Sequence, residues 1–457
     1  MAIIGDFTDI AANQLMAAYR PVAFAPVDDG TGGTCPVVYC DVYFNGVYYK
    51  TLSSSSPYET VGIETVWTFD IQAVCQEYLS TTIPDITSFY VTGITSAIAS
   101  CYCKFRNSTV DSYGIITPQA TIPIQGTVDS APVPGSGYQS ITFYVVNASL
   151  QQADIQDLQT QLAAHKLLTY PTLTPPIEGT AWVFPLSYQN GGNDVPTGQN
   201  VPHPNACKVF AEDWGQFPII IAKSGLFGSS SHSAKVTVFI SHSGGMYVVD
   251  VIPSETLFDA SIYLIPSGVQ NLLILDSSFE TLLANAYWYQ IGIYDTTVDL
   301  PLFITPRFYV QLTSPAQPRT RIWFKNYLGQ LEAINFAETE SSLKVTSSNT
   351  ETPLIVPPID LNQTVAGMTR NNVRSNNNYT ATGQFLQSDM YLLKQLFDSS
   401  QTFIEVPSNN PTDTASAVLS PIKLVDTEIP TLTWLNSYEY RITAKYIMSN
   451  ENIIVRQ

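Results

Sequence analysis

The stretch that most constrains the fold of this chain runs from Thr320 to Phe336, with the sequence TRIWFKNYLGQLEAINF. Polar and apolar residues alternate on both sides of a short turn, which is the period of a β-strand whose two faces lie in different surroundings. Gly329 lies in the turn and can adopt positive φ without a steric penalty. The stretch therefore predicts a β-hairpin made of two strands with unlike faces.

Two further stretches predict hairpins for the same reason. Asn45-Gly46 separates two runs of strand-forming residues, and this dipeptide suits a type I′ turn because both positions of that turn need positive φ. Ser243-Gly244-Gly245 separates KVTVFISH from MYVVDVI. The segments LLILDSS (272–278) and YWYQIGIYD (287–295) are predicted to be additional strands. Turns roughly 8–15 residues apart indicate one or two β-sandwiches in the middle of the chain.

A short helix is predicted just before residue 80. Its apolar stripe, at spacings of three and four, consists of Ile71, Val74, Cys75, Tyr78 and Leu79. Asp70 is placed to cap the start of this helix. The pattern predicts a helix that packs one face on the first β domain.

Two other segments have helical periodicity. Residues 149–168 predict an amphipathic helix, and because it spans too few heptads for a coiled coil we expect it to lie on a domain. A capped helix is predicted from Ser388, with Met390, Leu393 and Phe397 facing inward.

Together these patterns predict a mainly β chain, with two or three β-sandwich-like domains that carry short helices and then a small α+β C-terminal block. The expected divisions are a β-sandwich domain with one short helix (1–116), a linker with a strand and the amphipathic helix (117–170), a β-rich middle region (171–339), an extended polar arm (340–382) and the α+β block (383–457). Prolines and glycines mark the linker, and Ser, Thr and Asn dominate the arm.

The net charge of −18 bears on the partners of the chain. A surface this acidic repels phosphate backbones, so we expect no direct nucleic-acid binding. Hydrophobic residues make up 45% of the chain and charged residues only 13%, so each domain can bury a core while uncharged polar side chains cover much of the surface. This composition suits polar interfaces with several neighbours.

We expect no targeting or membrane segment. The first residues, MAIIGDFTDIAANQ, lack a basic n-region and contain Asp6, unlike a signal peptide. No apolar run approaches the roughly 18 residues that a membrane-spanning helix needs. The sequence therefore predicts a chain that is made in a cytoplasm and has no membrane span.

The spacings of cysteine and histidine do not predict a metal site. The six cysteines are Cys35, Cys40, Cys75, Cys101, Cys103 and Cys207. Their C-x4-C and C-x-C spacings differ from the C-x2-C pairs of structural zinc sites, so we expect buried free thiols. The four histidines are His165, His203, His232 and His242, and they do not have ligand spacing either. We expect no metal and no cofactor.

Sequence motifs of catalysis are also lacking. Ser341 and Lys344 match S-x-x-K, but the partner motifs of that pattern do not occur. Asp28-Asp29 before Gly30 is typical of a turn rather than of a calcium loop. There is no nucleophile elbow, P-loop or H-E-x-x-H. We therefore expect no catalytic residues.

Three motifs, taken in their order along the chain, carry a resemblance to known proteins. They are FDIQAVCQEYLSTTIP (69–84) after an aromatic hairpin, TRIWFKNYLGQLEAINF (320–336), and the C-terminal pair PIKLVDTEI (421–429) and SYEYRITAKYI (437–447). In this order the chain resembles structural proteins of tailed phages and prophages of Bacteroidota, including the crAss-like group. That family offers no catalytic residues to carry over.

The resemblance implies a non-enzymatic component of the virion, in the tail, baseplate or neck, made in the host cytoplasm. It would be present in several copies as part of a ring, with other copies and other virion proteins as its partners. The polar arm at 340–382 would then drape on a neighbouring subunit and become ordered on assembly.

Two other classes of function stay open. A receptor- or glycan-binding appendage, a fibre or spike, would bind a host-surface glycan through aromatic residues and carboxylates of the loops 188–205 and 228–245. A polysaccharide-degrading enzyme would need two acids about 6–9 Å apart, a pair that leaves no trace in a sequence. Trp67, Trp288 and Trp323 could stack on sugar rings, although their regular alternation favours core or interface positions.

Overall fold

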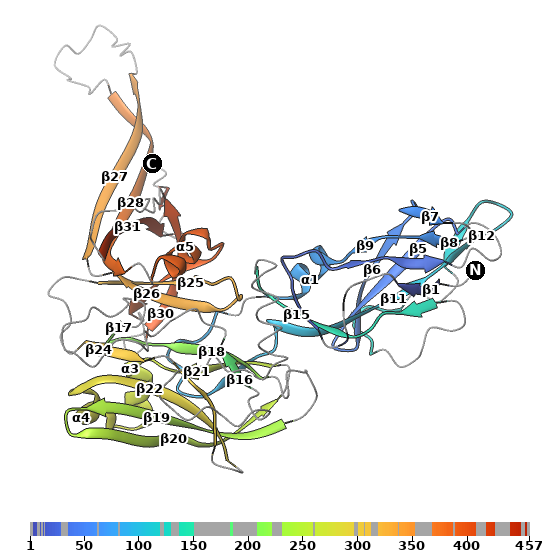
Figure 1. Ribbon diagram of the computed structural model, residues 1–457. Coiled ribbons are helices and arrows are strands. Elements are labelled where there is room, and N and C mark those ends of the chain that lie inside the picture. The colour runs from blue at the N-terminus through green and yellow to red at the C-terminus, as the bar shows by residue number, and fades with distance from the viewer. Residues whose placement is uncertain are drawn as a thin grey trace, which may run out of the picture. The chain divides into compact units, whose positions relative to one another are not determined.

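Figure 1 shows the computed structural model of the chain. Apart from short breaks, it describes residues 3–149, 208–221, 231–311, 319–351, 368–386, 389–407, 417–425 and 439–448, and the strands Val183–Pro185 and Ile453–Ile454. The chain divides into two compact units. Unit 1 comprises Met1–Tyr188, Glu212–Val310 and Asn326–Leu331, and unit 2 comprises Gln189–Ala211, Gln311–Lys325 and Glu332–Gln457.

Strands make up most of the described residues, which confirms the predicted mainly β fold class. The helices of the described residues are short, and they are α1 Gln72–Tyr78, α3 Val269–Leu275, α4 Phe279–Leu283 and α5 Met390–Asp398. Three predicted features lie outside the described residues: most of the amphipathic helix at 149–168, the loop at 188–205, and Cys207.

The first large sheet of unit 1 has the strand order β2-β15-β11-β5-β6, with β14 also paired to β11. Its strands are β2 Leu15–Ala17, β5 Val38–Phe44, β6 Val47–Ser54, β11 Ile98–Arg106, β14 Gly137–Gln139 and β15 Phe143–Val146. Asn45 and Gly46 have φ angles of 52° and 76°, as the predicted type I′ hairpin requires. Because β14 and β15 pair with β11, the sheet continues past residue 116, where we expected the first domain to end.

Shorter strands complete this part of unit 1. One small sheet has the order β1-β4-β8-β7, while β3 pairs with β9 and β12 pairs with β13. Their bounds are β1 Ile3–Asp6, β3 Ala23–Phe24, β4 Pro26–Asp28, β7 Glu59–Val61, β8 Glu64–Val66, β9 Phe69–Asp70, β12 Ser108–Val110 and β13 Ile116–Pro118.

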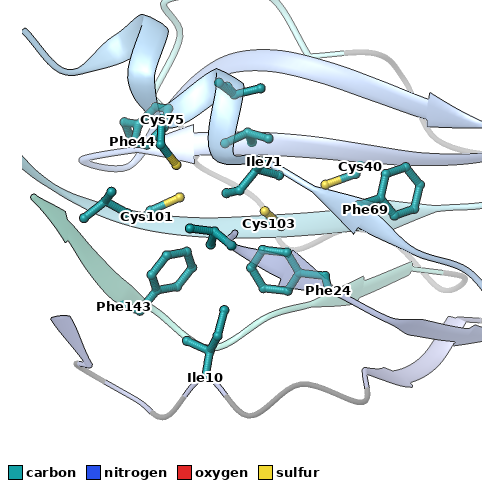
Figure 2. Close-up of a cluster of buried hydrophobic side chains, with 14 of the residues drawn as sticks. Ile10, Phe24, Cys40, Phe44, Phe69, Ile71, Cys75, Cys101, Cys103 and Phe143 are labelled. Atoms are coloured by element: carbon teal, nitrogen blue, oxygen red, sulfur yellow. The ribbon is translucent and has the colours of Figure 1, made fainter. Parts of the chain in front are cut away.

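A core of aromatic rings and thiols lies on one face of β5 and β11 (Figure 2). Alternate residues of the two strands supply it, namely Cys40, Val42, Phe44, Cys101, Cys103 and Phe105. Figure 2 shows the sulfur atoms of Cys75 and Cys101 pointing toward each other, with Cys103 and Cys40 farther along the same core. The core is formed by buried apolar side chains and thiols, and its members Val74, Cys75 and Leu79 hold α1 against the sheet.

The helix α1 has the apolar stripe that the sequence predicted. Ile71, Val74, Cys75 and Leu79 are buried, and Tyr78 stacks on Phe44 with 4.0 Å between ring centroids. Asp70 Oδ1 accepts the N–H of Gln72 at 2.9 Å, which satisfies one donor of the first turn, although the N-cap position itself is Ile71.

Two sheets pack face to face in the middle of unit 1 (Figure 1). One has the order β10-β21-β18-β16, and the other contains β24-β22-β19-β20 with β23 also paired to β22. Their strands are β10 Thr92–Ile94, β16 Val183–Pro185, β18 Gln216–Ile221, β19 Ser231–His242, β20 Gly245–Phe258, β21 Ser261–Pro266, β22 Ala286–Asp295, β23 Leu300–Ile304 and β24 Phe308–Gln311. The ring of Phe217 lies 5.8 Å from that of Phe303 and 6.4 Å from that of Phe308, so the two sheets form a sandwich.

The helix α3 corrects one prediction. LLILDSS was expected to be a strand, but Val269–Leu275 form a helix, because a short apolar run fits a buried helix as well as a buried strand. The buried side chain of Asn271 stabilises the helical turn by accepting the N–H of Gly215 at 2.8 Å and donating to the carbonyl of Ile86 at 2.9 Å. Those partners are distant in sequence, so the local pattern could not reveal them.

Unit 2 contains a curved sheet with the order β26-β25-β29-β30-β31-β28-β27, with β32 also paired to β28. The strands of unit 2 are β17 Lys208–Phe210, β25 Thr320–Lys325, β26 Leu331–Phe336, β27 Glu338–Glu351, β28 Met368–Leu386, β29 Thr402–Pro407, β30 Ala417–Val425, β31 Glu439–Met448 and β32 Ile453–Ile454. The helix α5 contacts β25, and its Leu392, Leu393 and Leu396 are buried. Its N-cap is Asp389, next to the predicted Ser388, which lies outside the described residues.

The hairpin predicted at Thr320–Phe336 is present as β25 and β26, and Gly329 in its turn has a φ of 84°. The prediction of two unlike faces is wrong, because nearly every residue of both strands is buried. Polar side chains of the hairpin find partners inside the protein. Trp323 Nε1 donates to Glu405 Oε2 at 3.1 Å, and Asn335 Nδ2 donates to the carbonyl of Lys208 at 3.3 Å.

Candidate functional site

Neither the described cysteines nor the described histidines form a chemical site. Among the described residues, no group of three or more His, Cys, Asp or Glu side chains could hold a metal ion. The five described cysteines are buried and free, and burial raises the pKa of the Cys40, Cys101 and Cys103 thiols well above its ordinary value. Thiols in this state are poor nucleophiles, so they act as core residues.

The side chain of His242 has a local role in the β19–β20 turn. Its Nδ1 accepts the N–H of Gly244 at 3.0 Å, and its ring meets that of Tyr247 edge to face. The other histidines contribute nothing to a described site: His165 and His203 lie outside the described residues, and His232 lies on β19.

The ion pair between Asp41 and Arg106 is the most buried one that we find in the described part of unit 1, and it has a structural role. Both side chains are 2% exposed, and Arg106 Nε and Nη2 donate to the two carboxylate oxygens of Asp41 at 2.5 and 2.8 Å. Thr51 Oγ1 donates to Asp41 as well, at 2.6 Å. Because both oxygens of Asp41 are occupied by partners, the pair is not arranged for general acid–base catalysis.

Most of the residues that the sequence singled out for sugar stacking or metal binding are inaccessible. Trp67 and Trp323 are 2% and 1% exposed and belong to cores, as their alternation predicted. Asp28 is buried at the end of β4, and Asp29 and Gly30 lie outside the described residues. Trp288 is half-buried on β22 and is the one tryptophan of these three that solvent reaches.

The first candidate site is a ribbon formed by β27 and β28, which include most of the predicted polar arm at 340–382. The two strands pair antiparallel from Glu338 opposite Thr382 to Glu351 opposite Met368. β28 also pairs with β31, but only from Tyr379 to Leu386, and with β32 at Arg374 and Ser375. Beyond those contacts the hairpin continues as two strands alone, and Figure 1 shows it extending past the other strands of its sheet.

The sequence of the ribbon offers few apolar side chains that could stabilise it. Residues 342–351 and 368–378 contain few apolar side chains, namely Leu343, Val345, Met368 and Val373. An isolated two-stranded hairpin is marginally stable in water, and it needs a third strand or a packed face to become independently stable. The ribbon is therefore a segment whose order depends on what covers it.

The second candidate site is the outer face of the β19–β20–β22 sheet. Register places Phe239, Gln290 and Val248 in one row across the three strands, on the face opposite the sandwich core. The rings of Phe239 and Tyr294 have centroids 6.0 Å apart and cover Gly292. A Cβ added to Gly292 would lie 2.7 Å from the ring of Tyr294 and 2.9 Å from the ring of Phe239. This face therefore presents aromatic rings where an antiparallel sheet usually presents polar residues.

Charged groups border the aromatic rings of this face. The guanidinium of Arg307 lies 4.4 Å from the ring centre of Trp288, and Lys235 Nζ lies 5.7 Å from that of Tyr294. Thr237 Oγ1 donates to Asp250 Oδ1 at 2.6 Å, and this hydrogen bond, assisted by Lys235, lowers the pKa of Asp250. The arrangement offers rings for stacking and ionised groups for hydrogen bonding on one surface.

The loops proposed for glycan binding contribute only in part to this face. Residues 188–205 lie outside the described residues, while 231–245 form β19 and its turn. The ring-bearing residues Phe239 and Tyr294 were missed because they lie within strands. Their alternation with buried residues such as Val238 and Ile293 was the available signal.

Within the described residues, no helix has both the length and the apolar character needed to cross a lipid bilayer. No protein-family model matches the chain, and no curated protein matches it either.

Proposed function

We propose that this chain is a non-enzymatic structural component of a tailed-phage virion, a multi-copy ring, baseplate, neck or tail protein. The observation that carries the proposal is the β27–β28 ribbon, which leaves its own sheet as two strands with few apolar residues. Such a ribbon gains stability when a neighbouring subunit covers it, since another surface then supplies the packing that its own sheet does not.

Two further features support a structural role. The polar, charge-poor composition suits broad interfaces with several neighbours, because uncharged hydroxyl and amide groups are cheaper to desolvate than ions. The resemblance of three motifs to structural proteins of tailed phages of Bacteroidota points to the same class. On this proposal the partners are other copies of the chain and other virion proteins, and the protein acts in the tail or neck of the particle.

The test removes the ribbon, including Arg374 and Ser375 where β28 pairs with β32, and leaves the rest of the sheet intact. Residues 343–377 are replaced by Asn-Gly, since Ser342 and Asn378 are paired and a two-residue turn can join them. A matched control shortens the β19–β20 hairpin by joining Ile240 to Tyr247, which are also paired, through Asn-Gly. Mass photometry and negative-stain imaging then compare both variants with the full chain.

We expect the full chain and the control to form the same defined oligomer, and the ribbon-shortened chain to remain a monomer. Mass spectrometry of purified particles should find the full chain in the virion, and the ribbon-shortened chain should be absent from it. A full chain that stays monomeric and is missing from particles would refute the proposal.

A second candidate function is a receptor- or glycan-binding appendage, favoured by the aromatic outer face of the β19–β20–β22 sheet. The flat face of a pyranose ring stacks on aromatic rings, and Asp250 and Lys235 could bind its hydroxyl groups. Saturable binding on a glycan array, reduced at least about 10-fold by Trp288→Ala, would support this function. Tyr58→Ala, which removes a 73% exposed aromatic side chain just before β7, is the control.

A further inference from the structure

We infer that Arg307 is the carboxylate-binding residue of a site for sugar acids on the outer face of the β19–β20–β22 sheet. The inference goes beyond the structural role, and it rests on the second candidate function because it names the chemical class of glycan that this face would take. Three observations carry it: the guanidinium of Arg307 has no anionic partner, it lies on the ring of Trp288, and the backbone on both sides of it is anchored.

Arg307 is unpaired in a chain where carboxylates are plentiful. The sequence has 38 aspartates and glutamates against 20 lysines and arginines. Arg106 and Arg321 each lie close to a carboxylate, that of Asp41 and that of Glu405 respectively. Among the described residues, Arg307 has neither an ion-pair partner nor a hydrogen-bond partner, and its Nε is buried without one. The guanidinium can therefore bind an anion that comes from outside the chain.

The terminal nitrogens of this guanidinium reach solvent. Nη1 and Nη2 of Arg307 are not buried, unlike its Nε. Arg106 shows how a guanidinium binds a carboxylate in this protein, since two of its nitrogens donate to the two oxygens of Asp41. Nη1 and Nη2 of Arg307 offer a similar planar pair of donors to a carboxylate in solution.

The guanidinium lies on an aromatic ring that solvent also reaches. Its carbon atom Cζ is 4.4 Å from the ring centre of Trp288, which is half-buried on β22. The residue opposite Trp288 on β19 is Ser241, whose side chain is too small to cover an indole ring. A sugar ring can therefore contact the exposed part of Trp288 while its carboxylate binds Arg307.

The backbone before and after Arg307 is anchored to β22. Thr305, two residues earlier, donates its N–H to the carbonyl of Ile291 and accepts the N–H of Ile291 at its Oγ1, both at 2.9 Å. Phe308, the next residue, stacks on Tyr289 with 5.1 Å between ring centroids. The position of Arg307 is therefore set before a ligand arrives, which lowers the entropic cost of binding.

The charge of the site favours a singly charged carboxylate over other anions. Lys235, the other cation beside these rings, is already paired with Asp250 at 3.2 Å, so Arg307 is left to neutralise the ligand. A phosphate monoester carries about two negative charges at neutral pH, and a chain with a net charge of −18 repels it more strongly than a carboxylate. A uronic acid has a pyranose ring for Trp288 and one planar carboxylate for the guanidinium, so we expect uronic acids as ligands.

The experiment compares two sugars that differ in one group. Methyl β-glucuronide carries a carboxylate where methyl β-glucoside carries a hydroxymethyl group, and saturation-transfer NMR with the full-length chain measures the dissociation constant of each. We expect the glucuronide to bind at least about 10-fold more tightly. Arg307→Gln should abolish this preference by weakening glucuronide binding alone, whereas Trp288→Ala should weaken the binding of both sugars.

Two further variants test the role of the planar guanidinium. Arg307→Lys keeps the charge but loses the paired donors, so it should retain only part of the preference. Lys394→Gln removes an exposed cation from α5 in unit 2 and should leave both dissociation constants unchanged. Circular dichroism checks that each variant is folded.

The outcomes separate this inference from the function on which it rests. If both sugars bind the unmodified chain equally, or if Arg307→Gln keeps the preference, carboxylate binding by Arg307 is wrong and glycan binding stands. Tighter binding of methyl β-glucoside 6-phosphate than of the glucuronide would also overturn the inference. If neither sugar binds at concentrations up to about 20 mM, the inference and the glycan-binding function are both wrong. The structural role is decided separately, by the ribbon-shortened chain.

Discussion

The hairpins β25–β26 and β27–β28 follow one another along the chain, and they have opposite relations to the protein around them. The first is buried along nearly its whole length, and Ile322, Phe324 and Phe336 are fully enclosed. The second begins in the same sheet and then leaves it as a polar ribbon. The comparison shows that strand pairing alone does not say what stabilises a hairpin, because one is stabilised by its own core and the other needs a covering surface.

Breaking the turn of the first hairpin should have the largest effect. Gly329 has positive φ, and a Cβ added to it would lie 1.7 Å from the carbonyl oxygen of Asn147, so Gly329→Ala forces the backbone apart. We expect it to lower the free energy of unfolding by about 4 kcal/mol or more, measured by urea denaturation. Gly114 also has positive φ, but no atom lies near an added Cβ. Gly114→Ala should therefore lower the free energy of unfolding by only about 1 kcal/mol.

Removing a core ring from the first hairpin should have the next largest effect. Phe324 is fully buried on β25, so Phe324→Ala leaves a cavity and should cost about 3–4 kcal/mol in the same measurement. Ser341→Ala changes an exposed residue near the base of the second hairpin and should stay within about 0.5 kcal/mol. Equal losses from the two substitutions would remove the distinction between the hairpins.

The buried lysine of the first hairpin should make stability depend on pH. Burial lowers the pKa of Lys325 from 10.5 to about 8, so between these values the unfolded chain binds a proton that the folded chain has released. Stability should therefore rise as pH increases from 8 to 10.5. Lys325→Met should flatten that rise and add on the order of 1 kcal/mol at pH 7, after allowance for solvent screening.

Lys394→Met is the control for this pH dependence. It removes an exposed lysine from α5 and should leave the slope between pH 8 and 10.5 as it is in the unmodified chain. A flat profile for the unmodified chain itself would show that Lys325 does not titrate in this range.

Shortening the second hairpin should have the smallest effect on folding. In the monomer, replacing residues 343–377 by Asn-Gly should change the free energy of unfolding of unit 2 by no more than about 0.5 kcal/mol, because most of β27 and β28 in this span pairs only with each other and not with the rest of the sheet. A loss of several kcal/mol would mean that the ribbon stabilises its own sheet, and the contrast between the two hairpins would not hold.

Local sequence signals predicted the hairpins well and the tertiary relations poorly. Asn45-Gly46, Gly245 and Gly329 each mark a turn that the structure contains, because positive φ leaves few choices of residue. The stripe on α1 was equally clear, since spacings of three and four have one structural meaning.

The failures share one physical cause, which is burial by residues distant in sequence. LLILDSS became α3, a helix whose buried Asn271 is bonded to a carbonyl more than a hundred residues away in sequence. The alternation in β25 and β26 suggested a solvent face, but residues from other strands bury their polar side chains. Of the candidate sites, the sequence indicated the ribbon by composition, whereas the aromatic face could be found only from strand register.

The thiol-rich core on one face of β5 and β11 allows the opening rate of the first β domain to be measured. A fully buried thiol whose pKa is raised does not react with an alkylating reagent, so labelling waits for the core to open. In a Cys207→Ser variant, the alkylation rate of Cys40, Cys75, Cys101 and Cys103 measures how often that core opens. The labelling rate measured before and after assembly reports whether incorporation into a larger particle slows the opening of this domain.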